Sequence, residues 1–135
     1  MTRQFWINLP VKDIDKSKDF FAKLGFSVNK QNSNQAALVI GDKNAPVMLF
    51  QELAFKNIIR NEIVDTNQAS EVLLSIDAAS KEEVDELTKK VVNAGGSIFE
   101  EPAEHHGWMY GCGFADLDGH RWNVLYMDMS KMPKD

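Results

Sequence analysis

One carboxylate whose position could serve acid–base chemistry is that of Glu71, which begins the apolar run EVLLSID at residues 71–77. Such a run predicts a strand. A carboxylate at this place is most often a solvated strand end. If it faced an apolar cleft instead, it would be suited to proton transfer. Both interpretations remain open from the sequence.

The histidines and the single cysteine are the other candidates for catalysis. His105 and His106 are adjacent in an expected loop at residues 102–107, and their spacing matches no zinc motif. We expect this pair at the surface and His120 in a structural role. Cys112 lies between two glycines with no basic partner close in sequence, so we expect a small buried residue rather than a nucleophile.

The elements that would position these side chains follow one order twice: strand, helix and three further strands. In the first half, Asp13 or Asp15 can cap a helix that runs to Leu24. In the second half, Ser80 and Glu83 have the spacing of a capping box at the start of another helix. The expected strands are residues 5–11, 26–30, 36–40, 47–51, 71–77 and 97–100, followed by a hairpin.

Two segments between these elements are harder to interpret. Residues 41–44 are expected to form the turn between two strands. Residues 53–69 mix apolar and charged side chains without a clear period, and we interpret them as a linker between the halves. One or two helical turns and a loop folded over a cleft are equally compatible with this linker.

The hairpin at residues 111–126 has an Asp-Gly pair in its turn, which is a strong hairpin signal. Because strand side chains alternate between two faces, Arg121 and Asn123 share one face and Trp122 points the other way. A polar pair between large apolar neighbours is typical of a half-buried strand with a wet side. It is also the pattern expected of a face that contacts a ligand.

Composition and net charge argue against several classes of function. The 135 residues are 44% hydrophobic and 26% charged, which is ordinary for a globular domain. A net charge of -5 without a basic block argues against nucleic-acid binding. No apolar stretch approaches the length of a membrane span, and the start carries no apolar leader, so we expect no membrane association. One cysteine cannot form an internal disulfide, so we expect a cytoplasmic protein.

Two motifs carry a family resemblance. The hairpin sequence DLDGHRWN at residues 116–123 and the segment VKDIDKSKDFFAKLGF at residues 11–26 resemble the signatures of the vicinal-oxygen-chelate superfamily, which includes glyoxalases, extradiol dioxygenases and bleomycin-resistance proteins. The resemblance implies one α+β domain over residues 1–135, built from two βαβββ modules whose curved mixed sheets form an open cup. The modules would span about residues 3–52 and 70–128, with the linker at 53–69.

The resemblance also implies where a site would lie. In that superfamily, ligands project from the first and last strands of each module, which correspond here to Trp6, Met48, Glu71 and Asn123. Asn8 could add a weak oxygen donor. Asn123 stands where the metalloenzymes typically carry a glutamate ligand. Divalent metals prefer imidazole and carboxylate donors, and only Glu71 supplies one, so we expect no tightly bound metal cofactor.

Two functions follow from the resemblance. The first is a binder similar to the bleomycin-resistance proteins, in which an apolar, aromatic cleft holds a small molecule through Trp6, Asn8, Met48, Arg121 and Asn123. The second is a metal-dependent lyase, similar to lactoylglutathione lyase, in which Glu71 is both the metal ligand and the catalytic residue for a small oxygenated substrate. A homodimer is expected in either case, since members of the superfamily commonly pair.

Overall fold

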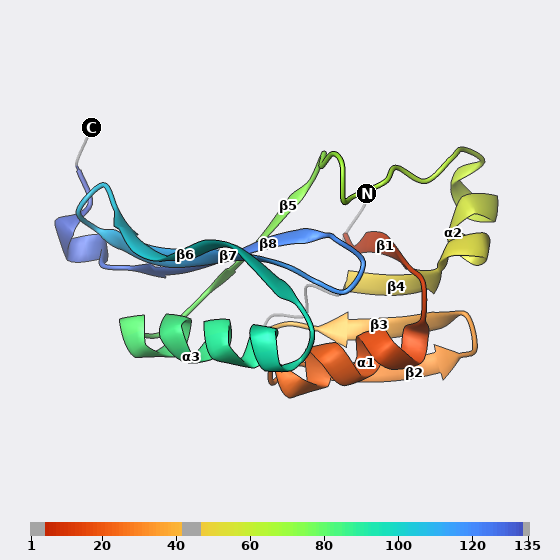
Figure 1. Cartoon of the computed structure of the whole chain (residues 1–135), viewed down its shortest axis with the longest axis horizontal. Helices are drawn as coiled ribbons and strands as arrows, with labels where there is room; N and C mark the ends of the chain where they lie inside the picture. The colour runs from red at the N-terminus through yellow and green to blue at the C-terminus, as the bar shows by residue number, and fades with distance from the viewer. Residues whose placement is uncertain (1–4, 42–46, 134–135) are drawn as a thin grey trace. The chain divides into compact units, whose positions relative to one another are not determined.

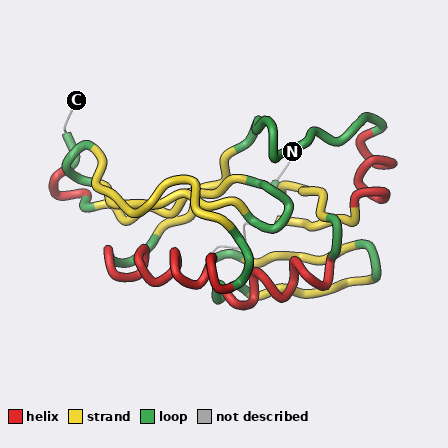
Figure 2. The backbone as a smooth tube through the Cα atoms, in the orientation of Figure 1, coloured by secondary structure: helices red, strands yellow, loops and turns green. Residues whose placement is uncertain are grey.

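The computed structural model describes residues 5–41 and 47–133. The chain forms two compact units, one ending at Asp65 and the other beginning at Thr66. Each unit is a four-stranded mixed sheet with a helix on one face, and neither sheet closes into a barrel (Figure 2). The predicted α+β fold with two βαβββ modules is therefore confirmed. The expected turn at 41–44 lies, from residue 42 onward, outside the described residues.

The first unit has the sheet order β1-β4-β3-β2, in which β1 pairs in parallel with β4 and the other pairs are antiparallel (Figure 1). Its elements are β1 (Ile7–Val11), α1 (Ile14–Lys23), β2 (Ser27–Asn32), β3 (Gln35–Val39), β4 (Val47–Gln51) and α2 (Glu52–Ile59).

The core of the first unit lies between α1 and one face of this sheet. Asp13 caps α1, because its carboxylate accepts hydrogen bonds from the backbone N–H groups of Asp15 and Lys16. Phe20 and Phe21 on this helix are fully buried. They meet alternate strand residues, since every second side chain points to the same face. These buried strand residues are Leu9, Val11, Ala36, Leu38, Val47 and Leu49.

The second unit repeats the arrangement with the order β5-β8-β7-β6, and here β5 pairs in parallel with β8 (Figure 1). The Ser80 hydroxyl caps α3 by accepting from the N–H of Glu83, as the capping-box spacing predicts. The elements are β5 (Leu73–Asp77), α3 (Lys81–Asn93), β6 (Ser97–His105), β7 (Met109–Ala115), β8 (Arg121–Met127) and a 3-10 turn at Met129–Lys131.

Several boundaries differ from the sequence prediction, and three of the differences are large or bear on the candidate sites. β5 begins at Leu73 rather than at residue 71, because its partner β8 begins at Arg121, directly opposite Leu73, and leaves the preceding residues without a pairing strand. β6 continues through the expected loop at 102–107 as far as His105. Pro102 is tolerated there because β6 is the edge strand, where a missing N–H leaves no neighbour unpaired.

The third difference concerns the expected linker at 53–69. It begins as helix α2, which contacts β1 and β4 and so belongs to the first unit.

No helix within the described parts of the chain is long and apolar enough to cross a membrane.

The hairpin turn of the second unit is held by the buried carboxylate of Asp116, which is only 7% exposed. One of its oxygens accepts hydrogen bonds from the backbone N–H groups of Asp118 and His120, both at 3.0 Å. The other accepts from the indole Nε1 of buried Trp122 at 3.0 Å. Burial raises the pKa of Asp116, while these bonds favour the ionised form. The turn and the core are thus joined by one side chain.

We expect Asp116→Asn to lower the free energy of unfolding by about 1–3 kcal/mol, because an amide has only one acceptor atom and its NH₂ group must face either the backbone donors or the indole N–H. Chemical denaturation measures the loss. Asp77→Asn, at an exposed position at the end of β5, is the matched control. Equal stability of the two variants would contradict this account of the turn.

Candidate functional site

An open groove of about 580 Å³ lies in the first unit, on the face of the sheet that α1 leaves uncovered. The sheet contributes Asn8, Met48, Phe50 and Gln35 to the groove. In the strand register Asn8 lies beside Met48, and Phe50 lies beside Gln35. These residues alternate with the buried core residues of the same strands, so strand parity places them on the open face.

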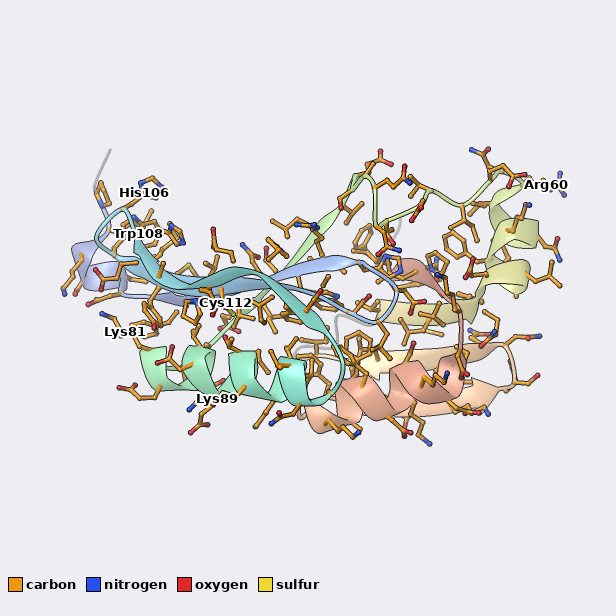
Figure 3. The ribbon with its side chains drawn as sticks, viewed as in Figure 1. Arg60, Lys81, Lys89, His106, Trp108 and Cys112 are labelled. Atoms are coloured by element: carbon orange, nitrogen blue, oxygen red, sulfur yellow. The ribbon has the colours of Figure 1, made fainter. Side chains whose placement is uncertain are left out.

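Helix α2 forms the other wall of the groove. It begins directly after β4 and contributes Phe55, Ile58 and Ile59, whose spacing places them on one helical stripe. The helix ends at Ile59 and is followed by Arg60, which Figure 3 labels. The backbone of Arg60 has the left-handed φ of 55°. Trp6, immediately before β1, completes the lining and is 51% exposed. The groove therefore presents a large apolar surface to solvent.

The entry to α2 is fixed by Gln51, the last residue of β4. Its side-chain oxygen accepts a hydrogen bond from the N–H of Ile14 at 2.6 Å, and its amide nitrogen donates to the carbonyl of Lys12 at 3.0 Å. One amide thus ties the end of β4 to the start of α1, at the point where the chain turns into α2.

The chemistry available in the groove is that of binding rather than of proton transfer. Among its described lining residues there is no acid, base or thiol, and the polar groups are the two amides of Asn8 and Gln35. Amides donate and accept hydrogen bonds but do not titrate in the physiological range. The structure thus brings together three of the predicted site residues, Trp6, Asn8 and Met48.

The other predicted site residues belong to the second unit, on the face of its sheet opposite α3. Arg121 and Asn123 lie two residues apart on β8, as the alternation predicts. The Arg121 guanidinium lies 4.3 Å from the ring centroid of Phe99. The Asn123 side-chain oxygen accepts a hydrogen bond from the Ser75 hydroxyl at 2.5 Å.

Glu71 is exposed and precedes β5 by two residues. The residue that faces Asn123 across the parallel pair is Ser75. No group of three or more His, Cys, Asp or Glu side chains that could hold a metal ion occurs among residues 5–41 and 47–133. The donors present in this part of the chain do not fit a preformed centre for the divalent metal that the resemblance implies.

A second, smaller hollow of about 230 Å³ lies in the second unit, at the turn between β6 and β7, where Figure 3 labels His106 and Trp108. Its charged groups are paired with one another. The ammonium of Lys81 lies 2.6 Å from a carboxylate oxygen of Glu104, and Lys131 lies 3.9 Å from Asp128. Because the ion pairs satisfy these charges locally, we interpret the hollow as structural.

Cys112 and His106 take the places that the sequence suggests, whereas His105 ends strand β6 rather than lying in a loop. Cys112 is buried between its sheet and α3, and this burial raises the pKa of its thiol (Figure 3). His106 is exposed, with a left-handed φ of 57°. His105, at the end of β6, lies 3.3 Å from a carboxylate oxygen of Glu100. Within the described residues these groups form no catalytic arrangement.

Sequence reasoning missed the wall of the groove. Phe55, Ile58 and Ile59 lie in the expected linker, where the structure forms the helical turns that the sequence leaves open, and only the structure shows that they line the groove. Gln35 was also missed, since an isolated glutamine beside a polar turn carries no signal of its own.

Comparison with known proteins matches most of the chain to one family. A family model described as the Glyoxalase/Bleomycin resistance protein/Dioxygenase superfamily matches residues 3–124. The chain is similar to a solved hypothetical protein from S. aureus at 36% identity, over 93% of this chain and 94% of that one, with a TM-score of 0.85. A search of the curated proteins finds no match.

Two further solved structures support the fold alone, because their identities are low. A glyoxalase/bleomycin resistance protein/dioxygenase family enzyme from Burkholderia phytofirmans PsJN is 19% identical over 90% of this chain and 96% of its own, with a TM-score of 0.77. A glyoxalase-related enzyme from Fulvimarina pelagi is 16% identical over 93% and 88%, with a TM-score of 0.81.

The smaller hollow yields a pH prediction. The Tyr110 hydroxyl donates a hydrogen bond to Asp85 at 2.6 Å, and this bond raises the pKa of Tyr110 to about 12. Since the folded state holds this proton more tightly than the unfolded chain does, stability should fall as the pH rises from about 10 to about 12. In an ultraviolet titration, Asp85→Asn should move this phenolate step toward lower pH, and Tyr110→Phe should remove it. An unchanged titration in Asp85→Asn would contradict the assignment.

Proposed function

The chain belongs to the glyoxalase/bleomycin resistance protein/dioxygenase superfamily, and from this premise we propose that it binds a small, largely apolar molecule in the groove of its first unit. The observation that carries the proposal is the lining. Six of the eight lining residues are apolar or aromatic, and the remaining two are neutral amides. Small-molecule sites in proteins are typically lined in this way, with few polar groups that orient the ligand.

The size and shape of the groove suit such a ligand. A volume of about 580 Å³ lies within the usual range for drug-sized molecules. Trp6, Phe50 and Phe55 offer flat surfaces on which a planar ligand can stack, and Met48 adapts its flexible thioether to an irregular outline. Removing apolar surface from water contributes roughly 25 cal/mol per Å².

The two amides give the groove its polarity. Asn8 lies on β1 and Gln35 on β3, so they flank β4 on either side. A ligand with a carbonyl or hydroxyl group could hydrogen-bond to either amide while its apolar body remains over β4. The amides carry no charge, so the proposed ligand is neutral where it contacts this groove.

The alternative function is a metal-dependent lyase that acts on a small oxygenated substrate. It is supported by membership of the superfamily and draws on Glu71 as its strong donor. The described donors do not form a metal-binding group, so we derive no catalytic step for it.

Nile red, a neutral dye that fluoresces in apolar surroundings, tests the binding proposal. We expect Trp6→Ala and Phe55→Ala each to weaken its binding about tenfold or more, because each removes a large contact surface in the groove. Leu53→Ala is the matched control: Leu53 lies on the same helix but is 74% exposed and does not line the groove. Equal losses in Leu53→Ala and Phe55→Ala would refute the proposed location.

Metal analysis tests the alternative. We expect purified protein to carry no stoichiometric divalent metal, and calorimetric titration with Mn²⁺, Ni²⁺ and Zn²⁺ to show no binding tighter than about millimolar, since one carboxylate is a weak ligand set. One metal per chain, lost in Glu71→Gln with the fold intact, would favour the lyase and count against the binder.

A further inference from the structure

The second unit carries an arginine, Arg121, that no acid among the described residues neutralises. Arg121, on β8, is half-buried, and its guanidinium forms no ion pair or hydrogen bond with any residue in the described parts of the chain. Its contact is with the ring of Phe99, 4.3 Å away. Stacking uses the flat face of the guanidinium, so the N–H donors in its plane remain available to an acceptor.

The Phe99 ring, on which Arg121 stacks, can take its position because Gly113 has no side chain. A Cβ built on Gly113 would lie 2.5 Å from two carbons of the Phe99 ring, closer than any real side chain could approach. The ring therefore lies directly against the backbone of β7. Arg121 is fixed in turn, because its guanidinium rests on a ring that the glycine locates.

Asn123 supplies a second donor on the same face. Its side-chain oxygen is occupied by the Ser75 hydroxyl at 2.5 Å. The amide NH₂ group is then the part of Asn123 left to bind another molecule, two residues along β8 from Arg121. Two donor groups, one of them a permanent cation, thus share one strand face without an acceptor between them.

The surroundings are apolar rather than acidic. Leu73, the register partner of Arg121, is 54% exposed, and Phe99 is 43% exposed. Glu100, next to Phe99 on β6, has a carboxylate oxygen 3.3 Å from His105 instead. A ligand here would meet N–H donors at one end and an aliphatic and an aromatic surface beside them.

We propose that this face of the second sheet, formed by Arg121, Asn123, Phe99 and Leu73, binds the carboxylate of a small acid with an apolar body. A guanidinium presents its donors as a planar fork that matches the two oxygens of a carboxylate. The Asn123 amide adds a further hydrogen bond, and the flanking apolar residues contact the body of the acid. This site uses no residue of the groove in the first unit and does not depend on the function proposed for it.

The test is an NMR titration of ¹⁵N-labelled protein with benzoate, and with benzamide as the neutral ligand of the same shape. We expect benzoate to shift the Asn123 side-chain amide and to bind at least about tenfold more tightly than benzamide. Arg121→Gln should remove this difference. Arg121→Lys, which keeps the charge but loses the fork and the stacking, should retain only part of it.

Lys89→Gln is the matched control, because it removes one positive charge from α3 of the same unit, where the side chain projects away from the sheet (Figure 3). We expect its benzoate affinity to match that of the unaltered chain. Equal binding of benzoate and benzamide, or an equal loss in Lys89→Gln and Arg121→Gln, would overturn the proposal. If Arg121→Gln fails to fold, the Arg121→Lys titration decides in the same way.

Discussion

The parallel pairing of the first and last strands in each unit is the constraint on which the rest of this structure depends. β1 pairs with β4, and β5 pairs with β8, so the chain between them must cross over the sheet. Parallel neighbours require such a crossover, and in both units it includes a helix. The helix and the core occupy one face of the sheet. The opposite face is left to solvent, and every feature with a proposed function lies on such a face.

The two open faces differ although the two folds match. In the first unit the face carries Met48 and Phe50, and a second helix, α2, stands beside it. In the second unit the face carries Arg121 and Asn123 on the corresponding last strand. A repeated backbone thus offers one apolar and one cationic surface. Core residues on the helical side are restricted by packing, whereas residues on the open side can change at little cost to stability.

Core residues and open-face residues are separate sets, so superfamily membership determines the fold but not the chemistry of the residues on the open faces. The metal ligands implied by the resemblance would have to stand on the open faces. At the position where the resemblance implies a glutamate the chain has Asn123, and the side chain across from it is the hydroxyl of Ser75. Both are weak ligands for a divalent cation but good hydrogen-bonding partners, so this face is suited to binding an organic group.

The sequence by itself determined the order of elements, a cap at Asp13 or Asp15, the cap at Ser80, and the hairpin turn, because these depend on hydrogen bonds and periodicities spanning only a few residues. Only the tertiary structure decided which residues meet. The register of β5 against β8 places Ser75, not Glu71, opposite Asn123. The packing of α2 on the first sheet creates the groove. The packing of Phe99 on Gly113 creates the surface on which Arg121 stacks. Such contacts join residues far apart in the chain, so no pattern among neighbouring residues predicts them.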